Sequence, residues 1–405
     1  MKQPVSDLLI IGAGAVGLGV GYQIARKYPD MNITILEKER NVSEHQTGNN
    51  SGVIHSGIYY KPGSYKAKNC IDGRIELVAF AQEHDVQHDV CGKIIVATQE
   101  EELERLDKIY KTGLENGLTN CQIIDDKGIR EYEPYCVGIK GIFVPYTGII
   151  DYRGMCEKLK EIICRINPHN QVITAQEVKA IHRGTHDSTI RTANELFKTK
   201  YLIACAGLQS DRIERLDGMK TDSRIVPFRG DYFDLHPKAV NKVKNLIYPV
   251  PNPAFPFLGV HFTRMVLGGV ECGPSAVFSF KREGYTKTDF DLADAINALT
   301  FAGTWKLFSK NWKFGLEEYK KAFSKQLFLK QLQRLIPSLT MDELIEGRSG
   351  VRAMALKPNG EMVDDFLFAR DGRSIHVLNA PSPAATACLA IGTEVRKIAE
   401  DSFDW

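Results

Sequence analysis

The sequence has no long run of apolar residues. Among its 405 residues, no stretch approaches the roughly 18 consecutive apolar residues that read as a membrane-spanning helix. The stretch from Met1 to Asp7 is too short and too polar for a signal peptide. We therefore expect a cytoplasmic protein, and we leave open a peripheral contact with the inner face of the cell membrane.

The chain also has almost no net charge, because 52 lysines and arginines are balanced by 50 aspartates and glutamates. A net charge of +2 requires no strongly basic face, so nucleic acid is not an expected partner. The sequence lacks the nucleophile elbow G-x-S-x-G and the phosphate-binding P-loop. These absences argue against acyl transfer and nucleotide hydrolysis as the reaction of this protein.

Paired cysteines are missing as well. The nine cysteines are an odd number, and no two of them form a C-x-x-C motif. In a chain long enough to build its own core, this pattern favours reduced thiols in a reducing compartment over a disulfide framework or a zinc site. We expect no bound metal.

What the sequence does contain is a dinucleotide-binding pattern near its amino terminus. An apolar run at 8–11 leads into a G-x-G-x-x-G loop at 12–17, a helical segment at 18–27, a second apolar run at 33–36 and an acidic residue at 37. The glycines permit a tight turn and close approach of backbone to a pyrophosphate, and the acid can accept hydrogen bonds from ribose. The predicted contacts are Gly12, Ala13, Gly14, Ala15, Val16, Gly17, Glu37 and Lys38.

A polar, glycine-rich stretch from Glu44 to Tyr60 follows. Small residues with hydroxyl and amide groups suit a loop that lies along a cofactor. The predicted cofactor contacts in this stretch are Thr47, Gly48, Asn50 and Ser51.

Here the chain resembles a known family. The glycine loop, the acid 20 residues after Gly17 and the run T-G-N-N-S-G-V-I-H-S-G-I-Y-Y at 47–60 are similar to the FAD-dependent D-amino-acid-oxidase-like superfamily. Within it, the sequence most resembles the L-2-hydroxyglutarate oxidases and dehydrogenases. The runs P-F-R-G-D-Y-F at 227–233 and F-L-G-V-H-F-T-R at 257–264 carry the same resemblance.

The resemblance implies an α/β fold, in which a Rossmann-like FAD-binding domain is combined with a β-sheet-rich substrate domain that carries an inserted helical segment. Residues 1–80, 151–220 and 341–405 would then form the FAD-binding domain, with the run from Glu346 to Leu356 re-entering it. Residues 81–150 and 221–340 would form the substrate domain.

Further cofactor contacts follow from the resemblance. It implies that backbone near Val178 meets the adenine, although an ordinary strand from Val172 to Ile181 is an equal alternative. It places Ala206 and Gly207, at the end of an apolar strand, beside FAD. A C-terminal helix would point its positive end at the flavin, and a capped helix without cofactor is the alternative. The residues before this helix are Pro383, Ala384, Ala385 and Thr386.

The implied reaction is oxidation of L-2-hydroxyglutarate to 2-oxoglutarate, by hydride transfer to the flavin. This reaction needs a base for the hydroxyl proton and cations for the carboxylates. His55 and His261 are the candidate bases, and a loop or solvent-facing strand histidine is the alternative for each. Arg352, Arg229 and Arg264 are candidate carboxylate clamps or, alternatively, scaffold ion pairs. Tyr60 is a further candidate for substrate binding.

The segment 301–336 differs from the rest of the chain. Between Trp305 and Arg334 eight basic residues face two glutamates, a local charge of +6, and seven aromatic residues are interleaved. Such helices either bind the headgroups of an anionic membrane or cover the substrate domain with their lysines in water. The electron acceptor stays open between oxygen and a membrane quinone, and the membrane interpretation favours the quinone.

Two other functions stay open at this stage. One is a different FAD enzyme of the same superfamily, acting on an amino acid or on glycerol 3-phosphate. The other is a non-catalytic, membrane-associated flavin-binding module.

Overall fold

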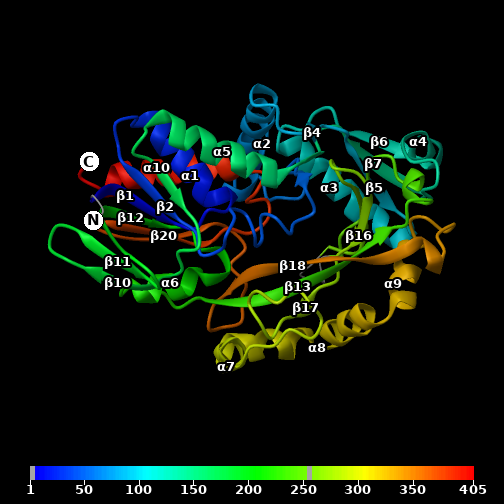
Figure 1. Cartoon of the computed structure of the whole chain (residues 1–405). Helices are drawn as coiled ribbons and strands as arrows, with labels where there is room; N and C mark the ends of the chain where they lie inside the picture. Colours follow the sequence, from blue (N-terminus) through cyan, green and yellow to red (C-terminus); the bar gives the residue numbers. More distant parts are fainter. Residues whose placement is uncertain (1–4, 253–257) are drawn as a thin grey trace.

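The computed structural model describes residues 5–252 and 258–405. Figure 1 shows a first sheet, covered by helices on its outer side, beside a second set of strands that lies next to α7, α8 and α9. The chain passes between the two regions more than once. Both termini lie together at the outer end of the first sheet.

The first sheet is built on parallel strands in the order β9-β2-β1-β12-β20. Residues Leu8, Leu9 and Ile10 of β1 are fully buried, as the unbroken apolar run predicts for a strand covered on both faces. An antiparallel hairpin and one further strand extend the sheet. Its strands are β1 (Ser6–Ile11), β2 (Ile33–Leu36), β9 (Gln171–Ile173), β10 (Val178–Arg183), β11 (Ser188–Thr192), β12 (Leu196–Ala204), β19 (Leu367–Asp371) and β20 (Ser374–Asn379).

Helices α1, α2, α5 and α10 form the core on one face of this sheet. A Cβ on Gly19 of α1 would lie 2.4 Å from the carbonyl oxygen of Cys388, so these two helices cross in close contact. Helix α6 packs on the opposite face. The bounds are α1 (Ala15–Lys27), α2 (Tyr65–Glu83), α5 (Tyr152–Ile166), α6 (Ser210–Leu216) and α10 (Cys388–Ser402).

The second sheet is mostly antiparallel, in the order β17-β13-β16-β15-β14-β5-β7-β6, and β18 pairs with β13. Its strands are β5 (Lys93–Ala97), β6 (Gln122–Asp125), β7 (Lys140–Val144), β13 (Arg224–Leu235), β14 (Leu246–Pro249), β15 (His261–Arg264), β16 (Val270–Gly273), β17 (Val277–Phe278) and β18 (Leu344–Leu356). A small sheet, β3-β8-β4, has strands β3 (Val53–Ile54), β4 (His88–Asp89) and β8 (Gly148–Ile150).

Separate apolar clusters hold helices against the second sheet. Helices α4 and α9 contribute to one cluster, α3 to another, and α8 packs near β13 and β17 in a third. The bounds are α3 (Leu103–Glu115), α4 (Asp126–Tyr132), α7 (Leu292–Leu299), α8 (Ala302–Phe323) and α9 (Lys325–Leu332). The basic aromatic segment is therefore helical, as expected, with a kink at Asn311.

The structure corrects three local predictions. The strand predicted over 172–181 is two strands, because Ala175 has a φ of +56° and turns the chain between β9 and β10. Large and small residues alternate over 257–264, which predicts a strand from Phe257, but β15 begins only at His261, and Phe257 itself lies outside the described residues. The run from Glu346 to Leu356 does not re-enter the first sheet, since β18 pairs with β13 along its length.

Candidate active site

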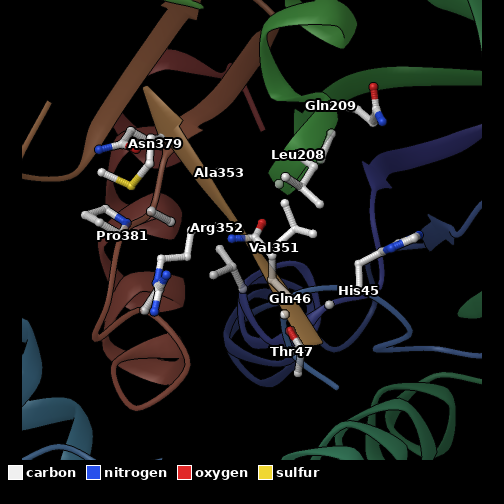
Figure 2. Close-up of a pocket in the computed structure, with 18 of the residues that line it drawn as sticks. His45, Gln46, Thr47, Leu208, Gln209, Val351, Arg352, Ala353, Asn379 and Pro381 are labelled. Carbon is white, nitrogen blue, oxygen red and sulfur yellow. The ribbon is translucent and has the colours of Figure 1, made fainter. Parts of the chain in front are cut away.

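A cavity of about 1890 Å³ is lined by residues from both large sheets. Figure 2 shows Val351, Arg352 and Ala353 of β18 between the loop of His45, Gln46 and Thr47 and the segment that carries Asn379 and Pro381. The predicted cofactor residues on its wall are Gly12, Gly14, Ala15, Val16, Glu37, Lys38, Thr47, Asn50, Ser51, Val178, Ala206, Gly207, Pro383, Ala384, Ala385 and Thr386.

The amino end of α1 opens on this cavity. Gly12 has a φ of +102°, and a Cβ there would lie 2.4 Å from the carbonyl oxygen of Cys205, so only glycine fits without strain. Gly14 is the N-cap and brings no side chain to the first turn. Thr47 Oγ1 accepts the Ala15 N–H at 3.1 Å. The helix dipole and the first-turn N–H groups make this end a site for phosphate oxygens.

Glu37 lies at the end of β2, buried beside the glycine loop. Its two carboxylate oxygens accept hydrogen bonds from the backbone N–H groups of Ala13, at 2.9 Å, and Glu39, at 3.0 Å. Each oxygen keeps a second lone pair for ribose hydroxyls. Lys38 reaches the same wall, but its ammonium already pairs with Glu39 and Glu283 at 2.6 and 2.7 Å.

A second helix end, that of α10, opens on the cavity from the other side. Its N-cap, Ala387, has only a methyl group, so the cap side chain accepts no hydrogen bond. Thr386 is buried just before the cap, and its hydroxyl interacts with Tyr152 at 3.0 Å and accepts the His55 N–H at 3.1 Å. Two helix N-termini thus place partial positive charge on one cavity.

His261 lies on the cavity wall, buried in β15. Its Nδ1 lies 2.9 Å from the carbonyl oxygen of Gly259. Because a carbonyl only accepts, Nδ1 carries the proton, and in the neutral ring Nε2 is the acceptor. Burial, assisted by the positive charges of Lys93 and Arg352, lowers the His261 pKa to about 4 although the bond to Gly259 opposes the shift. The neutral ring is the form that can accept a proton.

His55 lines the same cavity from the loop after β3. Its Nε2 lies 3.4 Å from the hydroxyl oxygen of Ser382. Burial, with the charges of Lys93, His261 and Lys66, lowers its pKa to about 3. The structure therefore brings both predicted histidines to one cavity, each in its uncharged form near neutral pH.

Arg352 is the predicted arginine that reaches the cavity wall. It projects from β18, and one guanidinium nitrogen lies 3.5 Å from the carbonyl oxygen of Ser275. Burial lowers its pKa, while Tyr232 and Glu318 oppose the shift. Arg352 is a half-buried cation on the same wall as two unprotonated histidines.

The other two predicted arginines lie outside the set that lines the cavity. Arg229 is buried against Asp231, with Nε 2.7 Å from the carboxylate, and donates to the carbonyl of Thr286. Arg264 pairs with Asp89. For both residues the geometry favours the scaffold ion-pair alternative, because each guanidinium already pairs with an aspartate of the protein.

The remaining predicted residues support the wall from behind. Ala13 is fully buried, and a Cβ on Gly17 would collide with the Gly12 carbonyl oxygen at 1.9 Å. Gly48 packs against the Ser43 carbonyl in the same way. Tyr60 lies under the ammonium of Lys66, which does line the cavity, at 5.3 Å from the ring centroid.

Comparison with known proteins identifies the family. Residues 7–398 match the model of a family described as FAD dependent oxidoreductase. The chain belongs to that family. This confirms the predicted superfamily, the fold class and FAD as the cofactor of an oxidoreductase.

Curated relatives match over nearly the whole chain. The L-2-hydroxyglutarate dehydrogenase of Indibacter alkaliphilus is 46% identical, with 96% of this chain and 97% of that protein covered. The mitochondrial L-2-hydroxyglutarate dehydrogenase of Homo sapiens is 41% identical, with 98% and 89% covered. These names confirm the predicted resemblance to that group.

Solved structures share the fold at low identity. An FAD-bound L-alpha-glycerophosphate oxidase from Mycoplasma pneumoniae has a TM-score of 0.80 at 22% identity, covering 98% of this chain and 95% of its own. Glycine oxidase from Geobacillus kaustophilus has a TM-score of 0.73 at 14% identity, covering 99% and 96%. Across the described ranges, no helix is both long enough and apolar enough to cross a membrane.

The residues present fit FAD. The Gly12–Gly14 turn and the end of α1 suit its pyrophosphate, and the buried Glu37 carboxylate suits its adenosine ribose. The amino end of α10 would lie near the flavin, where its positive end favours the reduced, anionic ring.

Sequence reasoning missed two tyrosines on the wall, Tyr232 and Tyr248. Tyr232 stands inside the quoted run P-F-R-G-D-Y-F, and Tyr248 follows the apolar pair Leu246-Ile247. The motif and the strand pattern could have pointed to these two tyrosines, but an aromatic residue in a strand more often belongs to the hydrophobic core than to a functional site.

One group in the described part of the chain could in principle hold a metal ion: Glu39, His45 and Glu283. The ammonium of Lys38 already pairs with both glutamates and offsets part of the negative charge that would attract a cation. We assign no metal to it.

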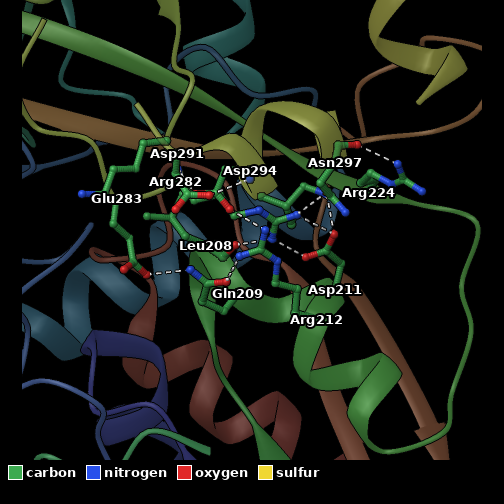
Figure 3. Close-up of polar contacts among 12 residues, drawn as sticks. Leu208, Gln209, Asp211, Arg212, Arg224, Arg282, Glu283, Asp291, Asp294 and Asn297 are labelled. Atoms are coloured by element: carbon green, nitrogen blue, oxygen red, sulfur yellow. Dashed lines mark hydrogen bonds and ion pairs between the residues drawn. The ribbon is translucent and has the colours of Figure 1, made fainter. Parts of the chain in front are cut away.

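The segment 279–297 holds part of the cavity wall in place. Arg282 is fully buried and donates to the carboxylate of Asp211 and to the carbonyl of Leu208, while Glu283 accepts from Gln209 at 2.7 Å (Figure 3). Because Leu208 and Gln209 line the cavity, these contacts connect the cavity wall to the segment 279–297, which directly follows β17.

Proposed function

We propose that this enzyme oxidises L-2-hydroxyglutarate to 2-oxoglutarate. The observation that carries the proposal is the cavity wall itself, on which the cation of Arg352 stands with the uncharged histidines His261 and His55. A 2-hydroxy acid needs this combination, because its carboxylates require a cation and its hydroxyl requires a base. Relatives with 46% and 41% identity carry the name of this dehydrogenase.

In the proposed mechanism Arg352 binds a substrate carboxylate with two parallel hydrogen bonds and fixes the orientation of C2. Nε2 of His261 then accepts the proton of the C2 hydroxyl, because Nδ1 is held as a donor by Gly259. When bound, FAD supplies the acceptor for the hydride. His55, with Ser382 at 3.4 Å, is the alternative base.

An anaerobic titration of the purified, yellow holoenzyme tests this proposal. Addition of L-2-hydroxyglutarate should bleach the visible flavin band, whereas the D form, glycerol 3-phosphate and an amino acid panel should not. If one of those other compounds bleaches the flavin instead, the enzyme acts on a substrate of another member of the family. A holoenzyme that no compound bleaches would favour the non-catalytic flavin-binding module.

His261→Asn and His55→Asn, measured in the same titration, identify the base. Asparagine can still donate near the position of Nδ1 but cannot accept the proton. We expect flavin reduction to slow by about 100-fold or more in His261→Asn, within the usual range for a lost general base. A larger effect in His55→Asn would reverse the assignment.

We further propose that the enzyme is peripheral on the inner face of the cell membrane and passes electrons to a quinone there. Helices α7, α8 and α9 expose large apolar side chains beside basic ones. The apolar set is Leu292, Ile296, Trp305, Trp312, Leu316, Phe323 and Leu327. The exposed basic set is Lys306, Lys310, Lys313, Lys320 and Lys330.

Two physical features support this acceptor. Exposed tryptophans beside lysines are the composition of a surface that binds anionic headgroups. Lys306, Leu307, Lys310 and Asn311 of α8 also line the cavity, so the same helix joins the apolar surface to the site. Oxygen is the alternative acceptor, and reoxidation of the reduced enzyme by air or by a soluble quinone distinguishes the two.

A further inference from the structure

Lys93, the first residue of β5, is a buried cation that has no carboxylate partner among the described residues. Its side chain is only 1% exposed. Its ammonium lies 4.5 Å from the ring centroid of Tyr59 and 4.7 Å from that of Tyr248. Within the described ranges it forms no ion pair, so its charge is met by the faces of two aromatic rings.

An ammonium in this position is costly. Burial lowers the pKa of Lys93 to about 7, against the small opposing effects of Cys70 and Cys121. Burial in turn raises the pKa values of these thiols to about 12 and about 11, so neither supplies negative charge near neutral pH. A hydrophobic residue would fill the same volume without this cost, which points to a role for the charge.

Tyr248 connects Lys93 to the candidate base. Its ring lies 4.1 Å, centroid to centroid, from the imidazole of His261 at an interplanar angle of 37°. Tyr248 and His261 both line the cavity. Lys93, Tyr248 and His261 come from β5, β14 and β15, so the arrangement exists only in the assembled sheet.

Among the described residues, the charged groups that act on the His261 pKa are the cations of Lys93 and Arg352. Arg352 approaches from β18, Tyr232 from β13, and His55 from the loop after β3. The pKa values of Tyr232 and Tyr248 are raised by burial, so both hydroxyls stay protonated. The positive charge of Lys93 lowers the pKa of His55 and of His261.

We propose that Lys93 is a positioning residue for the oxidation, which holds the ring of Tyr248 against the imidazole of His261 and places a positive charge behind it. The inference rests on the proposed function, in which His261 accepts the hydroxyl proton. The charge favours the unprotonated base, and its field favours a dianionic substrate in the cavity.

Lys93→Met tests the proposal, because methionine fills a similar volume without charge. The acid limb of the kcat/KM profile for L-2-hydroxyglutarate should move upward by about one pH unit, as a unit charge at short range implies for an effective dielectric near 20. Lys93→Arg, which keeps the cation over both rings, should restore the limb. Lys111→Met, an exposed lysine on α3, is the matched control and should leave the profile unchanged.

A readout without turnover separates this inference from the proposed function. In holoenzyme labelled with [13Cε1]histidine, the NMR titration of His261, assigned through His261→Asn, should shift upward in Lys93→Met and not in Lys111→Met. If the wild-type enzyme oxidises the substrate but His261 titrates identically in Lys93→Met, the inference fails while the function stands. If no 2-hydroxy acid bleaches the wild-type flavin, the proposed function itself is contradicted.

Lys93→Gln provides a second neutral side chain if the methionine variant yields no holoenzyme. Loss of flavin in both neutral variants, with full flavin content in Lys93→Arg, would overturn the proposal, since it would assign the lysine to the integrity of the fold. Normal flavin content with a shifted titration supports it.

Discussion

The carboxylate of Glu37 accepts the backbone N–H of Ala13 at 2.9 Å, although 24 positions separate the two residues. The bond ties the end of β2 to the turn that leads out of β1. It also holds one carboxylate oxygen in place at the cavity, where a ribose hydroxyl can reach it. The turn after β1 and the end of β2 are therefore joined into one structural unit at the cofactor site.

Glu37→Gln should weaken FAD binding. The amide keeps the size of the side chain but loses the charge, and a hydrogen bond to a charged group contributes about 1.5–3 kcal/mol, which corresponds to about 10- to 100-fold in Kd. Titration of apoenzyme with FAD, followed by flavin fluorescence, measures the change. Glu115→Gln, at the exposed end of α3, is the control, and equal affinities for the two variants would exclude the assigned role.

Arg352→Lys should raise KM for L-2-hydroxyglutarate by about tenfold or more, because an ammonium cannot form the bidentate pair with a carboxylate. Arg264→Lys is the matched control, since Arg264 pairs with Asp89 outside the cavity, and its KM should stay within about twofold. Initial rates over a range of substrate concentrations decide between the two. A larger KM change in Arg264→Lys would show that Arg264, and not Arg352, binds the substrate carboxylate.

The stability of the protein should fall in acid partly because of His261. Its pKa is about 4 in the folded protein, against the ordinary histidine value of 6.5, so the unfolded chain binds more protons between these two pH values. The unfolding free energy therefore decreases as the pH falls from about 6.5 to about 4, by up to about 3 kcal/mol for this group.

Thermal unfolding followed by circular dichroism at pH 7 and pH 5 measures that contribution. The drop in Tm should be smaller in His261→Gln than in the wild type by about 2 °C. His186→Gln removes an exposed histidine and should reproduce the wild-type drop. Identical drops in all three proteins would contradict the depressed pKa.

Neutralising the α8 lysines should release the enzyme from anionic vesicles. Each basic residue near such a surface contributes about 1 kcal/mol, so replacing Lys306, Lys310 and Lys313 with glutamine should reduce partitioning by about 100-fold. The control replaces three exposed lysines elsewhere, Lys108, Lys111 and Lys127, with the same change of charge. Sedimentation with vesicles containing an anionic phospholipid measures the effect, and equal binding by the two variants would remove the proposed surface.

Arg282→Met should destabilise the protein strongly, because it leaves the buried carboxylate of Asp211 without its main partner. Breaking a buried pair in this way costs about 3–5 kcal/mol. Lys158→Met removes an exposed pair with Glu161 and should cost at most about 0.5 kcal/mol. Tm and flavin content report together, since Leu208 and Gln209 beside this pair line the cavity. A Tm like that of the control would mean that other groups stabilise the buried carboxylate of Asp211 when Arg282 is removed.

Much of the site could be predicted from the sequence where it is local. The turn at Gly12, the helix after it and the acid at Glu37 lie within one β-α-β unit, and their spacing reflects the geometry of that unit. The motif at 47–60 likewise brought Thr47 and His55 into view, and both line the cavity.

Other features depended on pairing between distant strands. The sequence could not choose among Arg229, Arg264 and Arg352, because each stands in a strand and only the partners differ. Pairing of β13 with β18 brings Arg352 to the wall, while Asp231 and Asp89 engage the other two arginines. The run from Glu346 to Leu356 was predicted to re-enter the FAD-binding domain, whereas it pairs with β13 in the second sheet, because the residues of a strand do not specify its partner.

By itself, the sequence determined the cofactor unit and the helical nature of the basic segment, because these follow from short-range spacing of glycine, acidic and apolar residues. The family was indicated by the resemblance of its motifs to those of known proteins. Only the tertiary structure decided which cations reach the cavity, that Nδ1 of His261 is held by Gly259, and that Lys93 lies under Tyr248. The physical reason is that proton affinity depends on burial and on nearby charges, and both are set by residues that are distant along the chain.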